Sequence, residues 1–113
     1  MTGDVRAQTN LGVMYDEGMS VSQDDKTAVK WYTLAAEWGN AAAQSNLGAM
    51  YYNGKGVIQD DVYAHMGWNI ATLNGDTNAV KNRDIVAKRM TPPDISIAQK
   101  LASECVRKNY KDC

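Results

Sequence analysis

Residues 7–18 read AQTNLGVMYDEG, and residues 43–54 read AQSNLGAMYYNG. Both stretches belong to a longer internal repeat, because residues 7–42 laid over residues 43–78 without a gap are identical at 15 of 36 positions. A period of roughly 20–50 residues is typical of solenoids, in which small repeated units stack on one another. The sequence therefore predicts a stack of similar units.

Turn residues indicate that each unit contains two helices. A glycine followed by Asp or Asn recurs at residues 3–4, 39–40 and 75–76, as expected where one helix ends and the next begins at once. Gly18 and Gly54 can end the first helix of a unit, and the aspartates at 24–25 and 60–61 can cap the second. We expect helices near 5–17, 25–38, 41–53, 61–73 and 77–90, and a sixth at about 92–108.

The predicted fold is all-α, an α/α superhelical repeat solenoid of two full 36-residue helix pairs and a C-terminal capping pair. It forms a single domain over residues 1–113, with units at about 4–39, 40–75 and 76–108 and a tail at 109–113. Gly12 and Gly48 allow the second helix of a unit to approach the first closely. The first helix also carries an apolar stripe at helical spacing, which indicates core: Ala7, Leu11, Met14 and Tyr15.

The composition excludes some classes of function. The chain has 12 Lys+Arg and 13 Asp+Glu, and no apolar run approaches the roughly 20 residues that span a bilayer. Charge is uneven, because residues 1–78 carry four basic and nine acidic side chains (net −5), whereas residues 79–113 carry eight and four (net +4). The basic residues are spaced along helices with acidic ones among them, which favours solvated faces, so we expect no nucleic-acid partner.

The residues show no catalytic or metal-binding pattern. The chain has one histidine, His65, and no Ser-x-x-Lys, Gly-x-Ser-x-Gly or phosphate-binding glycine loop. Helix capping explains the paired aspartates. We therefore expect no enzyme activity, no metal and no cofactor.

The repeat resembles the Sel1-like repeat (SLR) family, a 36-residue relative of the tetratricopeptide repeat. The pattern A-Q-x-N-L-G-x-M-Y-x-x-G, followed by A-x-x-W-Y-x-x-A-A-x-x-G, matches residues 7–39 almost throughout. In the second unit Gly67 stands where the first has Trp31, and from Ala79 the match fades, although residues 89–102 still resemble a closing helix pair.

The resemblance implies a non-catalytic scaffold or adaptor of bacterial type that binds a protein or peptide. Some secreted, cysteine-rich members of the family are linked to cell-wall ligands. The alternative is therefore a secreted or periplasmic enzyme accessory, or a hydrolase-like protein, that acts on cell-wall ligands.

A candidate peptide-binding strip lies opposite the apolar stripe on each first helix. The first helices of a solenoid line up on its concave face, where peptides usually bind. Positions on the stripe are mostly identical between units, whereas the opposite positions differ, as expected for a surface free of packing. The strip comprises Thr9, Val13 and Asp16, then Ser45, Ala49 and Tyr52, then Lys81 and Lys88, with Ile85 between the two lysines. An ordinary solvated helix face is the alternative.

The two cysteines allow a disulfide without requiring one. A continuous helix over residues 105–113 would hold the α-carbons of Cys105 and Cys113 about 12 Å apart, too far for a bridge, so the tail would have to turn back near Asn109. A bridge would favour a periplasmic or extracellular location. Otherwise Cys105 is a buried thiol and Cys113 a free one, and the location stays open.

The N-terminal end predicts an unfinished packing surface. Gly3 and Asp4 are in register with the two internal helix junctions, but no helix precedes them in the sequence. We expect the first helix to expose apolar surface, either because the chain is a fragment of a longer array or because it forms a homodimer.

Overall fold

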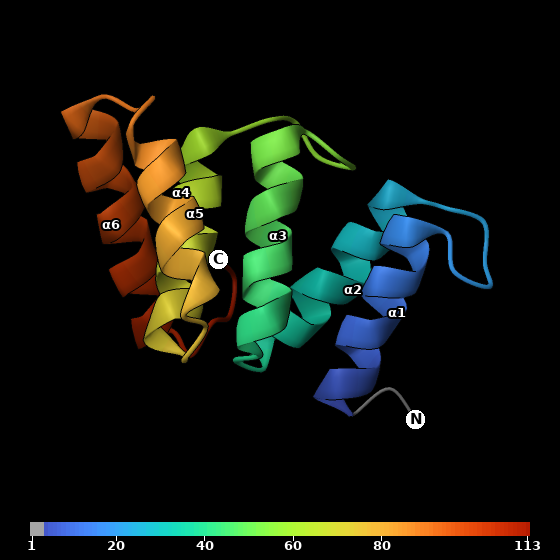
Figure 1. Cartoon of the computed structure of the whole chain (residues 1–113). Coiled ribbons are helices and arrows are strands. Elements are labelled where there is room, and N and C mark those ends of the chain that lie inside the picture. Colours follow the sequence, from blue (N-terminus) through green and yellow to red (C-terminus); the bar gives the residue numbers. More distant parts are fainter. Residues whose placement is uncertain (1–3) are drawn as a thin grey trace.

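The computed structural model describes residues 4–113, which form six helices (Figure 1). These are α1 (Val5–Glu17), α2 (Asp25–Glu37), α3 (Ala41–Asn53), α4 (Asp61–Leu73), α5 (Asn78–Ala87) and α6 (Pro92–Arg107). The predicted bounds hold to within one residue, except that α5 ends three residues early. The all-α repeat fold is confirmed. None of the helices in residues 4–113 has the length and apolar character needed to cross a membrane.

Polar caps and left-handed glycines set the helix bounds. Asp24 and Asp60, rather than the aspartates that follow them, accept hydrogen bonds from the first backbone N–H groups of α2 and α4. Gly18 ends α1 with φ at 70°, a left-handed conformation that glycine adopts at little cost. At the predicted N-terminal junction, Asp4 caps α1 and Gly3 lies outside the described residues.

An aromatic ring lying on a glycine holds each of the first two helix pairs together. The ring of Tyr32 on α2 covers Gly12 on α1, and the indole of Trp68 on α4 covers Gly48 on α3. A β-carbon on Gly12 would come within 2.5 Å of the Tyr32 ring, and one on Gly48 within 3.1 Å of the indole. A side chain at Gly12 would therefore force the Tyr32 ring to move, and one at Gly48 would press tightly on the indole.

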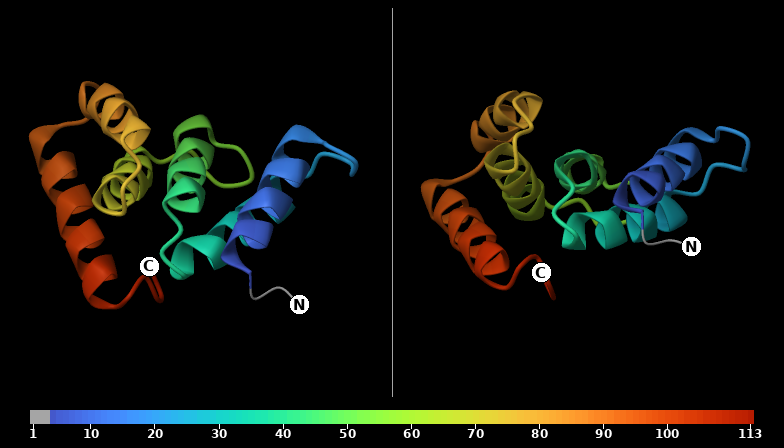
Figure 2. Two further views of the ribbon diagram at one scale, coloured as in Figure 1. Left: turned by 60° about the horizontal axis from the view of Figure 1, so that its bottom comes forward. Right: turned by 90° about the horizontal axis from the view of Figure 1, so that it is seen from below.

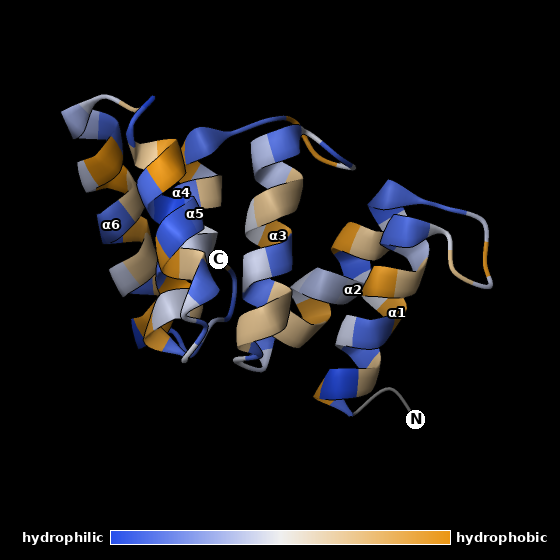
Figure 3. Cartoon of the chain, viewed as in Figure 1, coloured by the Kyte–Doolittle hydropathy of each residue, from blue (hydrophilic) through white to orange (hydrophobic). Residues whose placement is uncertain are grey.

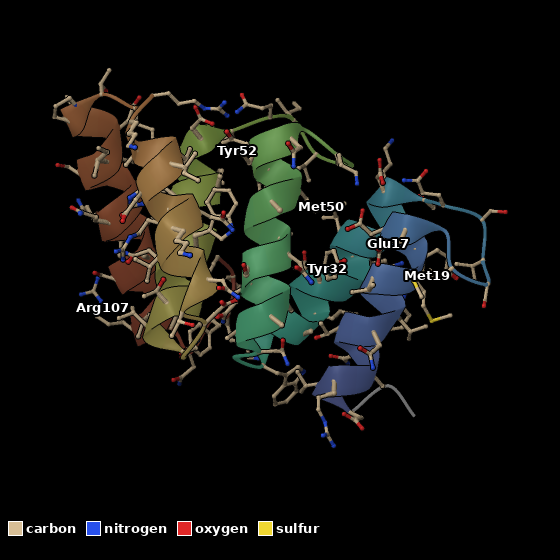
Figure 4. All side chains as sticks on the ribbon, in the orientation of Figure 1. Glu17, Met19, Tyr32, Met50, Tyr52 and Arg107 are labelled. Carbon is tan, nitrogen blue, oxygen red and sulfur yellow. A yellow bond between two sulfur atoms is a disulfide. The ribbon has the colours of Figure 1, made fainter. Side chains whose placement is uncertain are left out.

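The pairs stack in sequence, and each second helix packs between two first helices. The α2 helix contacts α1 and α3, and the α4 helix contacts α3, α5 and α6 (Figure 2). One core cluster joins Tyr32 of α2 to Met50 of α3, and both side chains lie in the region between α1, α2 and α3 in Figure 4. The α6 helix closes the array by packing on α4 through Ala102 and Cys105. The α4 helix is thus the central element of the fold.

Two positions of the apolar stripe are fully buried only where another unit covers them. On α3, Ala43 and Met50 are 0% and 2% exposed. Their register partners on α1 are Ala7, which is exposed, and Met14, which is half-buried like Leu11. We call Ala7, Leu11 and Met14 the α1 edge; Figure 3 shows apolar segments on α1 at this end of the array. The predicted exposure of apolar surface on the first helix is thus observed.

A disulfide fastens the C-terminal tail to α6. Cys105 and Cys113 are bonded, and their α-carbons are 5.4 Å apart. The chain turns back at Asn109, where φ is 53°. Asn accepts this left-handed conformation more readily than most residues.

The same tail also contacts the ends of two earlier helices. The Tyr110 hydroxyl donates a hydrogen bond to the side-chain oxygen of Asn74, after α4, at 3.0 Å. The Lys111 ammonium donates to the backbone carbonyl of Glu37, at the end of α2, at 3.3 Å, and lies 4.2 Å from the centre of the Trp38 ring. The tail therefore links α6 to both earlier units.

We predict that Gly12→Ala destabilises the protein by about 1–3 kcal/mol, because the new methyl group would overlap the Tyr32 ring. Urea unfolding followed by circular dichroism measures the change. Asn10→Ala on the exposed side of the same helix is the control and should stay within about 0.5 kcal/mol of the parent protein. Equal stability of the two variants would contradict the close contact.

Candidate protein-binding site

The first helices α1, α3 and α5 lie on one side of the molecule, with α2 and α4 behind them (Figures 1 and 2). We call the side of these three helices that carries the predicted strip the first-helix face. The structure divides this strip into a packed part on α1 and α3 and an open part on α5.

The packed part begins on α1. Thr9 is only 7% exposed, and its hydroxyl donates to the Val5 carbonyl at 3.0 Å. Val13 packs against the cluster that contains Met50. On α3, Ser45 and Ala49 are half-buried. These side chains therefore lie in the packing between helices, and their role in peptide binding stays a prediction.

Asp16 joins the first unit to the second. Its carboxylate accepts a hydrogen bond from the Tyr32 hydroxyl at 3.1 Å and pairs with the Lys55 ammonium at 2.7 Å. Burial, together with the charge of Asp16, raises the pKa of Tyr32, so the hydroxyl keeps its proton and remains a donor. The hydrogen bond to Asp16 likewise raises the pKa of Lys55. Asp16 thus has two partners within the protein.

Tyr52 is covered by a cation from the third unit. Its ring packs against Trp68, with ring centres 5.5 Å apart, and the Arg89 guanidinium lies 4.1 Å above it. Arg89 is held in place by two hydrogen bonds to the Asp61 carboxylate, at 2.6 and 3.0 Å. Tyr52 is therefore half-buried rather than freely exposed. Sequence reasoning missed Arg89, because only the packing of both α3 and α5 on α4 brings it, just after the end of α5, to this ring.

The open part of the strip lies on α5. Lys81 and Lys88 are exposed, and Ile85 between them is 52% exposed. Neither lysine forms an ion pair within residues 4–113. The strip on α5 therefore offers two free positive charges on either side of an apolar side chain.

A cavity of about 140 Å³ lies between α2 and α4. We call it the outer cavity. Residues at turn spacing line it on two helices, namely Leu47, Gly48 and Tyr51 of α3 and Met66, Gly67 and Ile70 of α4, and Thr33, Ala36 and Glu37 of α2 line it as well. The disulfide and Tyr110 also line it. Sequence reasoning noticed Gly67 as a departure from the repeat but did not predict a cavity.

His65, the single histidine, is buried. It is 3% exposed, and its Nδ1 atom has no hydrogen-bond partner within residues 4–113. Burial, and to a smaller extent the nearby Arg83, lower the pKa of His65, whereas Asp84 acts in the opposite direction. Within the same residues, no group of three or more His, Cys, Asp or Glu side chains could hold a metal ion. His65 is a neutral packing residue of α4.

We predict that stability decreases below about pH 6.5, the usual pKa of histidine. Because the folded protein lowers the pKa of His65, the unfolded chain binds a proton in this range that the native state does not. The His65 contribution to the free energy of unfolding is therefore constant above about pH 6.5 and falls below it, by at most about 1.4 kcal/mol per pH unit. Urea unfolding between about pH 7.5 and 5.5 measures the change. A His65→Leu variant should lose this pH dependence. If its free energy of unfolding changes with pH as steeply as that of the parent protein, His65 is not the cause.

Comparisons with known proteins agree with this geometry. The Sel1 repeat family model matches residues 5–40 and 41–66, so the second match stops just before Gly67. One similar solved structure is c5321, a protective antigen present in uropathogenic Escherichia coli strains that displays an SLR fold. It is 33% identical with a TM-score of 0.90, over 96% of this chain and 24% of that one. No curated protein matches the chain.

A second solved structure is a Sel1 repeat protein from Oxalobacter formigenes, 38% identical with a TM-score of 0.70 over 73% of this chain and 62% of that one. The chain thus spans about a quarter of the first protein and less than two thirds of the second. Sel1 repeats generally serve as protein–protein interaction scaffolds and are typically non-catalytic. Because two repeats match over more than half of its length, the chain belongs to the Sel1 repeat family.

Proposed function

We propose that the protein is a non-catalytic scaffold that binds an extended segment of a partner protein on the first-helix face. The observation that supports this is the open strip on α5, where Lys81 and Lys88 flank the half-exposed Ile85. Two unpaired cations around an apolar side chain suit a segment in which acidic residues surround an apolar one. Tyr52, beneath Arg89, extends this surface onto α3.

The residues on α1 contribute indirectly in this proposal. Asp16 holds Lys55, in the loop that follows α3, and thereby sets the position of α3 against the first unit. Val13 and the buried Thr9 fill the space beside it. The partner segment therefore contacts mainly α5 and the adjacent end of α3.

We also infer that the protein works in an oxidising compartment, the periplasm or the outside of the cell. The Cys105–Cys113 bridge supports this, because disulfides persist in such compartments and are rare in the cytosol. An enzyme accessory that acts on cell-wall ligands would share the location. The unpaired lysines and Ile85 favour a protein segment over that alternative.

We predict that a Lys81→Glu, Lys88→Glu double variant loses the peptides that the parent protein selects from a diverse library. Each selected peptide should bind at least about tenfold more weakly, because attraction becomes repulsion at the strip. Fluorescence anisotropy at two salt concentrations measures the affinities.

The matched control is Lys100→Glu, Arg107→Glu, which makes the same charge change on exposed positions of α6. Circular dichroism confirms that both variants are helical. The proposal fails if no peptide is selected, or if both variants weaken binding equally.

We further propose that the α1 edge pairs with a second copy of the chain. On α3 the equivalents of Ala7 and Met14 are buried, whereas Ala7 is exposed and Met14 is half-buried like Leu11. None of these three α1 side chains carries a charge. An antiparallel pair centred near Leu11 places the small Ala7 of one copy opposite the large Met14 of the other. Such a contact is self-complementary, as a two-fold dimer requires.

Light scattering tests the pairing. We expect a dimer to form as concentration rises from about 5 to 500 μM, because association follows mass action. A Leu11→Lys variant should remain monomeric over this range, whereas Leu73→Lys, an exposed apolar position outside the edge, should still dimerise. A parent protein that is monomeric throughout would rule the dimer out.

A further inference from the structure

The outer cavity has a floor made of backbone. Gly48 of α3 and Gly67 of α4 meet there, and a β-carbon on Gly67 would lie 3.1 Å from the Gln44 carbonyl and 3.2 Å from the Gly48 α-carbon. The first unit carries Trp31 at the position of Gly67. The close approach of α3 and α4 through Gly67 is therefore specific to the second unit.

The walls of the cavity are mostly apolar. Leu47, Met66 and Ile70 line it, and so do the stacked rings of Tyr51 and Tyr63, whose centres are 5.2 Å apart. The disulfide lines it as well. Ligand sites are mainly apolar with a few placed polar groups, as these walls are. We therefore expect the space of about 140 Å³ to accommodate one large apolar side chain.

Among residues 4–113, one charged side chain lines the cavity. Glu37 at the end of α2 lines it, and its carboxylate forms no ion pair within residues 4–113. The nearby Lys111 ammonium is directed to the Glu37 backbone carbonyl and to the Trp38 ring. The Glu37 carboxylate is therefore the charge that an incoming group would meet.

We propose that the outer cavity binds an apolar side chain of a partner segment in which a lysine or arginine follows directly and pairs with Glu37. The charge of Glu37 selects the basic residue, and the apolar walls select the side chain that enters. This site lies between α2 and α4, away from the α5 strip. It prefers a basic segment, whereas the α5 strip prefers an acidic one. It therefore goes beyond the function proposed above and provides a second recognition point on the scaffold.

Three matched peptides test the proposal by NMR titration of the ¹⁵N-labelled protein: GSGLRRGSG, GSGLEEGSG and GSGARRGSG. The first should shift the amide signals of Gly48 and Gly67. The other two should bind at least about fivefold more weakly, because one lacks the charge pair and the other the buried leucine. A Glu37→Gln variant should remove the preference for arginine over glutamate.

Thr33→Trp is the blocking variant, because Thr33 lines the cavity and is exposed, so a larger side chain there fills the mouth without entering the core. Leu34→Trp on another side of α2 is its matched control. We expect Thr33→Trp to abolish the shifts and Leu34→Trp to retain them. The Lys81→Glu, Lys88→Glu variant should also retain them, which separates this site from the α5 strip.

Several results would overturn the proposal. These are the absence of shifts at Gly48 and Gly67 with the leucine–arginine peptide, equal binding of all three peptides, and shifts that persist in Thr33→Trp. Shifts confined to the amide signals of α5 would likewise place binding outside the outer cavity. None of these results tests the acidic segment proposed for α5. That proposal is tested separately, by the Lys81→Glu, Lys88→Glu variant.

Discussion

The contact between an aromatic ring and a glycine is the interaction on which the rest of the structure depends. Tyr32 can lie on Gly12 only because no side chain intervenes, and this sets the distance between α1 and α2. The hydroxyl of the same tyrosine then donates to Asp16, which pairs with Lys55 of the second unit. One side chain therefore closes a helix pair and orients the ion pair that attaches the next one. Breaking the ring contact would disturb both levels of packing, because contacts in one network are not independent.

The second unit reaches the same result with different chemistry. Trp68 replaces Tyr32 over its glycine, and Tyr52 stands at the register position of Asp16. A cation from the following unit again covers this position, since Arg89 lies over the Tyr52 ring while it binds Asp61. An ion pair at one junction is thus replaced by a cation–π contact at the next. Packing between units therefore explains the difference between Asp16 and Tyr52 at this position.

This equivalence shows what the sequence alone could predict. Helix bounds and caps were predictable, because Asp24, Asp60 and Gly18 act on backbone groups a few residues away. The assignment of Thr9 and Asp16 to an open strip depended on which faces the next unit covers, and that is set by the angle between units. The spacing of the cysteines is compatible with both a bridge and free thiols, because the turn at Asn109 cannot be read from spacing. The outer cavity needed four separate segments to come together, so the only signal in the sequence was the exchange of Trp31 for Gly67.

The register position of Asp16 in the first unit and Tyr52 in the second is occupied by Lys88 in the third. In the first two units it lies beside a cation from the unit that follows, whereas α6 packs on α4 and does not extend the row of first helices. A lysine there has no neighbouring unit to meet within residues 4–113, and it stays exposed beside Ile85. The position that joins units inside the array thus recurs at its end as Lys88. It is positive where Asp16 is negative, and it forms no ion pair within residues 4–113. A binding segment with acidic residues would complete at α5 the kind of charged contact that Asp16 and Lys55 make between the first two units.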